Sequence, residues 1–203
     1  FMENLVENIS KLVAIELLFE EMPTRPTANA IFREARKIFG DINIINRDEN
    51  DIEFSVDKFV AYNEDNTTSP VVLAMGNITD FDDKVAVSEF ERTQIWNVAN
   101  SEELLSKYKY AVKIWDVNAQ RQIPKERAIM LVDWLNVALK LYPKCQAIWI
   151  KSAGKLQLAQ SIKNLKETGI VKYLYSMVNI RFFNVPNTNE FIVDSVGLAN
   201  IGL

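Results

Sequence analysis

The segment between Pro124 and Pro143 constrains the fold more than any other part of this chain. Proline suits the first turn of a helix, where no N–H donor is needed, and it stops a helix that reaches it from the N-terminal side. The residues between the two prolines are apolar around most of the helix, and the polar ones form a narrow stripe of Glu126, Arg127, Asp133, Asn136 and Lys140. Such a helix must be covered on several sides. The segment therefore predicts a mostly buried helix packed against a sheet.

Four strands and one shorter helix are predicted in the first half of the chain, before this long helix. "KLVAIELLFEEMP" (11–23) is typical of a buried strand. A helix follows, with Thr27 as its cap and Gly40 as its end, and its inward stripe is predicted as Ala30, Ile31, Ala35 and Ile38. Three further strands are predicted in "INIINR", "DIEFSVDKFVAYN" and "SPVVLAMGNI", because polar turn-forming clusters separate them.

The second half repeats this order loosely. Ser88 and Glu91 have the spacing of a capping box, and Ser101 precedes two acids, so two short consecutive helices are predicted. Strands are predicted in "KYAVKIWDV" and "CQAIWI", and the last two strands, "VNIRFFNV" and "EFIVDSV", form a hairpin around "PNTN". Between them, "KLQLAQSIKNLKETG" predicts an amphipathic helix that turns Leu158, Ile162 and Leu165 inward and ends at Gly169.

No linker rich in Pro, Gly or Ser divides the chain. We therefore expect a single α+β domain over residues 1–203, with a mixed or antiparallel sheet and packed helices. The shared order of elements also raises the hypothesis of two related β-α-β-β halves. Residues 1–100 hold 9 Lys and Arg against 19 Asp and Glu, whereas residues 101–203 hold 14 against 8. Either the halves neutralise each other, or an acidic and a basic face meet different partners.

The chain contains no histidine, and Cys145 is its only cysteine. These two facts exclude Ser-His-Asp and Cys-His catalysis, histidine-ligated zinc, multi-cysteine metal sites and a disulfide within the chain. We accordingly predict no catalytic, cofactor-binding or metal-binding residue, and no cofactor. An enzyme would have to use Asp, Glu, Lys, Tyr or Cys145 as its acid or base.

The sequence also bears on location. No apolar run is long enough to cross a bilayer, and the first ten residues carry acids where a signal peptide has basic residues. A lone cysteine agrees with a reducing compartment. We expect a soluble cytoplasmic protein without a membrane partner.

The stretch "AIWIKSAGKLQL" raises the question of a phosphate-binding loop at Gly154 and Lys155. Trp149 and Leu156 occupy positions where that motif requires Gly and Ser or Thr. We therefore predict a tight strand-to-helix turn in which Gly154 has a positive φ and Lys155 projects into solvent. Ser152 and Lys155 also have the S-x-x-K spacing of a serine–lysine dyad, but the companion motifs S-x-N and K-T-G are missing.

Three other features suggest binding surfaces. The acids of "TDFDDK" lack the spacing of a calcium loop and predict a solvated turn. The tryptophans, Trp96, Trp115, Trp134 and Trp149, lie in apolar segments, where packing in the core is usual. The alternative is that some of them line a ligand pocket. A lysine-rich stretch without arginine could contact an anion or a protein partner, and nucleic acid is disfavoured because the whole chain has a net charge of −4. Its members are Lys144, Lys151, Lys155, Lys163, Lys166 and Lys172.

The strand "YAVKIWDV", the long apolar helix, "AIWIKSAGKL" and the closing "FIVDSVGLANIGL" resemble, in this order, the bacterial domain-of-unknown-function family 4261. The segment "LLFEEMPTRPTANAIF" also resembles this family, whose members open with an apolar strand followed by a proline-containing turn and a helix. Its members often carry a histidine where Tyr110 stands, so no histidine-based chemistry is implied here, and they usually continue past the equivalent of Leu203. The resemblance implies a small bacterial cytoplasmic protein and no established activity.

These observations favour a non-catalytic binding module that contacts another protein in an immunity-like or regulatory role. A small-molecule sensor with an aromatic-lined pocket between the halves is the alternative. An enzyme without histidine is the third possibility.

Overall fold

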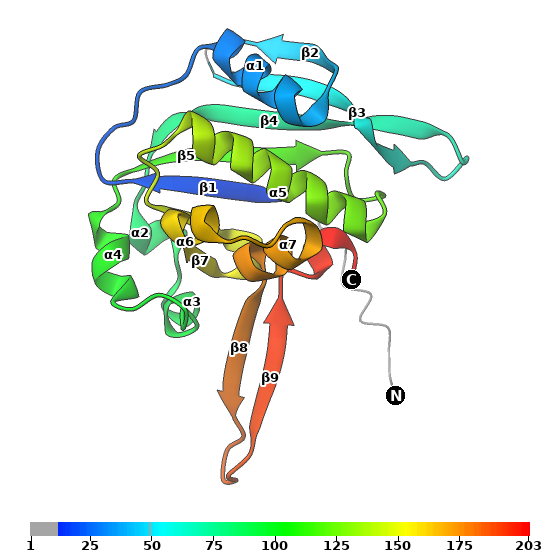
Figure 1. Cartoon of the computed structure of the whole chain (residues 1–203). Helices are drawn as coiled ribbons and strands as arrows, with labels where there is room; N and C mark the ends of the chain where they lie inside the picture. Colours follow the sequence, from blue (N-terminus) through cyan, green and yellow to red (C-terminus); the bar gives the residue numbers. More distant parts are fainter. Residues whose placement is uncertain (1–11, 49) are drawn as a thin grey trace.

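A computed structural model describes residues 12–48 and 50–203 of the chain. They form one α+β domain with a seven-stranded antiparallel sheet, helices packed on it, and a separate two-stranded hairpin (Figure 1). The predicted fold class is confirmed.

The strands of the large sheet are β1 (Ala14–Phe19), β2 (Ile42–Arg47), β3 (Ile52–Tyr62), β4 (Thr68–Asp80), β5 (Tyr110–Val117), β6 (Ala147–Ile150) and β7 (Lys155–Leu158). The hairpin consists of β8 (Asn179–Asn184) and β9 (Phe191–Val196). The helices are α1 (Ala28–Phe39), α2 (Asp83–Ala86), α3 (Glu89–Thr93), α4 (Ser101–Lys107), α5 (Pro124–Leu141), α6 (Ala159–Asn164) and α7 (Gly169–Met177). Two short 3-10 helices cover Lys151–Ala153 and Ala199–Ile201.

The strand order is β2-β3-β4-β5-β1-β6-β7, and each neighbouring pair is antiparallel. β1 comes from the first half of the chain but lies between β5 and β6 of the second half. The two halves therefore share one sheet. They also end differently, because β3 and β4 belong to that sheet whereas β8 and β9 stand apart, so the hypothesised halves are not equivalent units.

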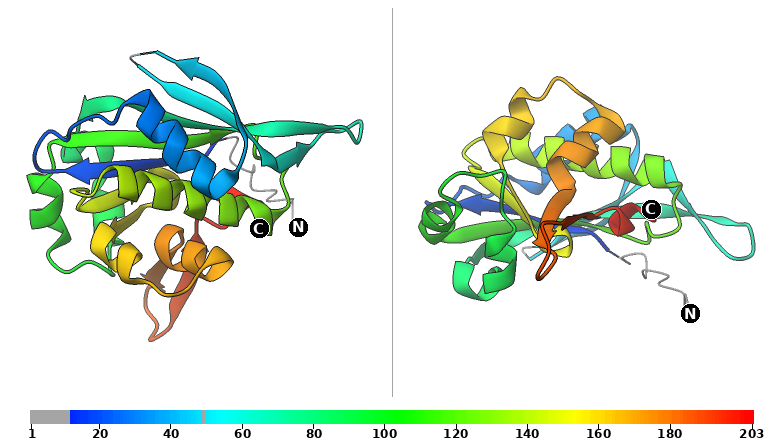
Figure 2. Two further views of the ribbon diagram at one scale, coloured as in Figure 1. Left: turned by 45° about the horizontal axis from the view of Figure 1, so that its top comes forward. Right: turned by 90° about the horizontal axis from the view of Figure 1, so that it is seen from below.

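One face of the sheet is covered by α1, α5, α6 and α7 (Figure 2). The long helix α5 is mostly buried, as predicted, with Trp134 wholly inside. Arg127 is a correction, because it does not belong to a solvent stripe. Its Nε donates to Asp116 Oδ2 of β5 at 2.8 Å, and both side chains are buried. A buried charge requires such a partner.

The other face of the sheet carries a second, smaller core under α2, α3 and α4. It contains Leu18 of β1, Trp149 of β6 and Leu156 of β7, together with Val98 and Leu105 from the helical segment. These helices are short and cover one end of the face (Figures 1 and 2). Their placement brings residues 88–97 to the base of the hairpin.

Helix α1 confirms its predicted ends. Thr27 accepts a hydrogen bond from Ala30 N at 3.3 Å, and Gly40 follows the last turn with φ of 78°. The predicted inward stripe is confirmed at Ile31 and Ala35, but Ala30 is only half-buried and Ile38 is exposed, while Phe32 and Phe39 are buried. The apolar face is rotated slightly because the aromatic side chains fill the space above β3.

The predicted helix over 155–169 is confirmed only for Ala159–Asn164, which form α6. Lys155–Leu158 form β7, which pairs with β6 so that Trp149 lies opposite Leu156. The alternation of K-L-Q-L has the period of a strand, and pairing with β6 outweighs the helical pattern that these residues share with α6. Gly169 is the first residue of α7 and not a C-cap.

Candidate functional site

The hairpin β8–β9 projects from the rest of the molecule (Figure 1). Its register places Phe182 opposite Val193 and Phe183 opposite Ile192. Because successive residues of a strand point to opposite faces, apolar side chains lie on both faces of the hairpin.

Many of these side chains are exposed, and Phe191 reaches 63%. A two-stranded sheet is marginally stable alone in water and usually needs a third strand or a packed element. The exposed apolar members are Ile180, Phe182, Phe191, Ile192 and Val193.

Polar contacts hold the base of the hairpin. Asn179 Nδ2 donates to Gly154 O at 2.9 Å, and Tyr173 Oη donates to Gly197 O at 2.7 Å. Gly197 has φ of 111°, and a Cβ there would lie 2.6 Å from Met177 O. Only glycine fits this position, so the chain leaves β9 on a defined path.

The segment 88–97, which contains α3 and is called the α3 segment, contacts β8 from both sides. Phe90 stacks on Phe183 at 6.3 Å between ring centroids, and Trp96 meets Phe182 edge to face at 5.9 Å. Since Phe182 and Phe183 point to opposite faces, Phe90 and Trp96 contact opposite faces of the hairpin. Trp96 is 60% exposed, so the expectation that it packs in the core is wrong.

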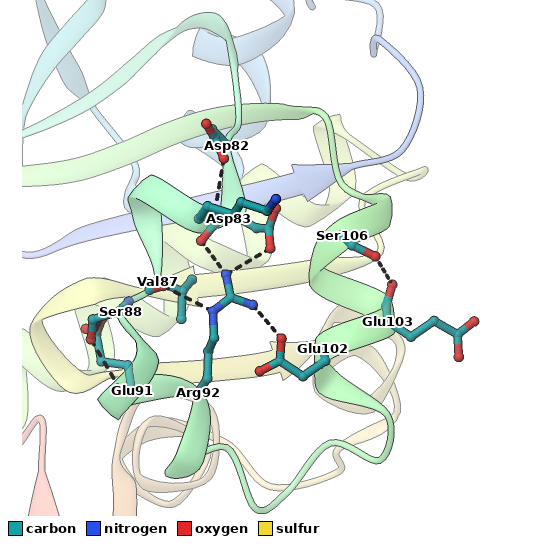
Figure 3. A network of polar contacts seen from close by, with 10 residues as sticks. Asp82, Asp83, Val87, Ser88, Glu91, Arg92, Glu102, Glu103 and Ser106 are labelled. Carbon is teal, nitrogen blue, oxygen red and sulfur yellow. Dashed lines mark hydrogen bonds and ion pairs between the residues drawn. The ribbon is translucent and has the colours of Figure 1, made fainter.

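Arg92 fixes the segment that carries these two aromatic rings (Figure 3). Its guanidinium donates to the carbonyl oxygen of Asp83 at 2.6 Å and to its carboxylate at 2.8 Å. It also donates to Glu102 Oε2 at 2.7 Å and to Val87 O at 3.3 Å. One side chain thus connects α2, α3 and α4.

The edge of β9 exposes unpaired backbone groups. Val185 N donates to Glu190 O, which sets the alternation of hydrogen-bonded pairs along the hairpin. By that alternation the N–H and C=O groups of Phe191, Val193 and Ser195 point away from β8. Among the described residues, none of these groups has a hydrogen-bond partner.

The other sheet edges are less open. β2 has an irregular register between Ile44 and Asn46, a distortion that hinders strand addition. At β7, Asn97 Nδ2 donates to Leu156 O at 2.9 Å. β8 lies beside the α3 segment. Of the outer strands in the part of the chain that the structure describes, β9 is the one with neither an irregular register, as in β2, nor such contacts from residues 88–97, as at β7 and β8.

A cleft of about 340 Å³ lies at the base of the hairpin, between α3 and the 3-10 helix Lys151–Ala153. Lys151, Glu91 and Arg181 are its charged lining residues. Glu91 also accepts hydrogen bonds from the backbone and hydroxyl of Ser88, which completes the predicted capping box. Phe90 belongs to both the cleft and the aromatic contact with β8, so the two features form one continuous surface.

The Gly154 turn has the predicted positive φ of 57°, but it leads into a strand and not a helix. Lys155 does not project into solvent, since only 8% of it is exposed, and that prediction is wrong. Burial lowers the pKa of its amine. Ser152 Oγ accepts from Asn200, and Lys155 has no hydrogen-bond or ion-pair partner among the described residues. A serine–lysine dyad is not formed.

The remaining lysines do not form a single group, although Lys163 lies close to Lys144. Lys144 and Lys151 lie at opposite ends of β6, and Lys163 Nζ donates to Pro143 O at 3.1 Å. The pKa of Lys172 is lowered by partial burial, which nearby Asp133 opposes. Only Lys151 lines the cleft at the hairpin.

Of the "TDFDDK" acids, Asp80 ends β4, whereas Asp82 and Asp83 lie at the start of α2. Asp82 Oδ1 accepts from Lys84 N at 3.0 Å and caps α2, while Asp83 is the partner of Arg92. Within residues 12–48 and 50–203, no three metal-ligating side chains form a cluster, and no helix has both the length and the apolarity to cross a membrane.

No family model, curated protein or solved structure matches this chain. The resemblance to the bacterial family 4261 therefore stays a hypothesis.

Sequence reasoning predicted the hairpin but not its role. The sequence signal for a binding role was the run of adjacent apolar residues in "RFF" and "FIV". Adjacent strand residues point to opposite faces, so both faces of the hairpin are apolar. The contribution of Phe90 and Trp96 was not visible in the sequence, because they lie more than eighty residues from β8.

Proposed function

We propose that this protein is a non-catalytic binding module that receives an extended segment of a partner protein along the free edge of β9. The observation that carries the proposal is the row of unpaired backbone groups at Phe191, Val193 and Ser195. Strand addition to such an edge gives affinity through backbone hydrogen bonds and specificity through alternate side chains. An immunity-like or regulatory role is compatible with this mode of binding.

The chemistry of the surface supports a protein partner over nucleic acid. The charges on the hairpin are few, and Arg181 is paired with Asp194 across the strands. Aromatic side chains with little net charge are typical of the centres of protein–protein interfaces, whereas protein surfaces that bind nucleic acid are strongly basic. We place this role in the bacterial cytoplasm, which the family resemblance and the single cysteine support.

The test is a photo-crosslinking comparison in cells that produce the protein. Phe191 and, as the control, Tyr62 are each replaced by p-benzoylphenylalanine, since both are exposed aromatic residues on strands. We expect a discrete adduct from position 191 and none from position 62. No adduct at 191, or the same adducts from both positions, contradicts the proposal.

A small-molecule site is the second candidate, and Tyr142 favours it. Its hydroxyl is buried without a hydrogen-bond partner among the described residues, and burial raises its pKa to about 12. Tyr142 borders a cavity of about 220 Å³ whose apolar walls include Phe19 and Met22. A small apolar molecule with one acceptor fits this chemistry.

Thermal shift measurements with a panel of such molecules test this second candidate. Stabilisation that is lost in Tyr142→Phe, while the melting temperature of the free protein is little changed, supports it. Equal shifts in both proteins contradict a role for the hydroxyl.

A further inference from the structure

We infer that the β9 edge pairs with β9 of a second copy of this chain, in an antiparallel register that places Val193 opposite Val193. This inference names a partner for the edge and so rests on the proposed role of β9 as a strand acceptor.

The environment of the hairpin selects the edge. The outward backbone groups of both β8 and β9 lack hydrogen-bond partners among the described residues, but α3 lies on the β8 side of the hairpin, where Phe90 and Trp96 contact the rings of β8 (Figure 1). Joining two β9 edges converts two marginal hairpins into one four-stranded sheet. Sheets of three or more strands with an apolar face are stable where a lone hairpin is not.

A two-fold axis restricts the possible registers. Residues whose backbone N–H and C=O groups point away from β8 must lie opposite such residues of the second copy. A two-fold axis through residue 192, 193 or 194 meets this condition and keeps the pairing near the middle of β9. An axis at 194 sets Asp194 opposite Asp194. An axis at 192 sets Glu190 opposite Asp194. Like charges directly opposite are unfavourable in a sheet.

The axis at Val193 avoids both conflicts. It places Phe191 opposite Ser195, Ile192 opposite Asp194, and Glu190 opposite Val196. Asp194 keeps its ion pair with Arg181 of its own hairpin. Phe182 and Val193 share one face, so the pairing also brings the apolar residues of two hairpins together on that face.

Cysteine scanning tests the register. In the proposed pairing the two Val193 Cα atoms are about 5.5 Å apart, within the range that a disulfide spans. The two Ile192 Cα atoms are diagonal neighbours about 7–8 Å apart, which is beyond that range. The native Cys145 is buried, and burial raises the pKa of its thiol to about 12, so it does not compete.

We expect Val193→Cys to form a disulfide-linked dimer under mild oxidation, with Ile192→Cys as the matched control that remains reduced. Light scattering of the wild-type chain over a wide concentration range should show a dimer in equilibrium. Val193→Pro removes the outward N–H from an edge position where proline is tolerated, and it should raise the dimer dissociation constant by about tenfold or more. Val193→Thr keeps the N–H and should remain a dimer.

A wild-type chain that is monomeric at every concentration overturns the inference, as does equal disulfide formation at positions 192 and 193. Either outcome is distinct from failure of the proposed function, which the adduct at Phe191 decides. An adduct that contains a different protein and no second copy contradicts the dimer while it supports strand addition.

Discussion

Lys155 is an uncommon residue for its position, because a charged amine in a buried strand without a partner is costly. It lies on β7, opposite Ile150, at the edge of the large sheet. Inward-pointing charges on edge strands discourage pairing with other chains. The residue thus has a reason to be there that is unrelated to nucleotide binding.

Lys155→Met should raise the free energy of unfolding at neutral pH by about 1 kcal/mol, because it removes a buried charge and keeps the apolar stem. Burial lowers the pKa of Lys155 in the folded chain below 10.5, its value in the unfolded chain. At pH values between the folded-state and unfolded-state pKa, the unfolded chain therefore binds more protons than the folded chain. The stability of the wild type should therefore rise with pH in that window and approach that of the variant.

Urea unfolding of both proteins from pH 7 to 10.5 measures this convergence. Exposed Lys166 supplies the matched control, since Lys166→Met should change the stability little at any pH. A loss of stability in Lys155→Met would show that the amine has a favourable partner.

Glycine is favoured at position 154 by the positive φ angle of the backbone and not by a lack of space for a side chain. A Cβ would lie 3.7 Å from the Glu91 Cγ atom, which is an ordinary contact. With φ of 57°, however, a β-branched side chain is strained.

Gly154→Val should lower the free energy of unfolding by roughly 1–3 kcal/mol, whereas Gly154→Asn should cost clearly less because asparagine tolerates this conformation. Denaturant unfolding of the two variants gives the comparison. Equal losses would indicate that the cost comes from contacts and not from the backbone angle.

At the scale of elements, α1 is joined to α5 by one carboxylate. Glu34 accepts from Lys140 of α5 at 2.7 Å and from Lys37 of its own helix at 2.6 Å. The hydrogen bonds from Lys140 and Lys37 lower the pKa of Glu34 from 4.5 to about 2. A carboxyl with a lowered folded-state pKa stabilises the fold above its unfolded pKa and loses that contribution as the pH falls.

Glu34→Gln should therefore flatten the loss of stability between pH 4.5 and pH 2 and leave a residual slope from other carboxyls. The pKa values of Asp48, Asp65, Glu103 and Asp194 are also lowered by their hydrogen bonds. Unfolding midpoints in urea across this range provide the measurement. An unchanged acid limb in the variant would show that the contact between α1 and α5 does not depend on ionised Glu34.

On the scale of the whole molecule, β1 unites the two halves of the chain. It is bonded to β5 on one side and to β6 on the other, and its residues Leu17 and Leu18 lie in the two different cores. β5 likewise has both of its neighbours, β4 and β1, in the first half of the chain, so each half supplies the only strand partners of one strand of the other.

The large sheet should consequently unfold in one transition, and the amides of Leu17 and Leu18 should exchange only through that global opening. Amides of the edge strand β2 should exchange faster. Hydrogen exchange followed by mass spectrometry or NMR, beside a urea titration, checks both expectations. Two separate unfolding transitions for the halves would contradict the shared sheet.

Local sequence was sufficient for most elements. The caps at Thr27 and Ser88, the glycine at 40 and the proline at 124 mark helix ends because each acts through its own backbone or its nearest neighbours. The strands β2 to β6 and the final hairpin were likewise predicted from alternation and turn residues. The register-dependent element β7 was not, because four residues fit a helix and a strand equally well until β6 lies beside them.

The sequence by itself determined most of the elements, though not β7 or α7, together with the buried character of α5 and the exclusion of histidine and multi-cysteine chemistry. Only the tertiary structure decided that β1 separates β5 from β6, that Arg127 is paired in the core, that Lys155 is buried, and that Phe90 and Trp96 reach the hairpin. The reason is physical. Caps and periodicity are interactions within a few residues, whereas burial, ion pairing and an open strand edge depend on which distant segments the fold brings together.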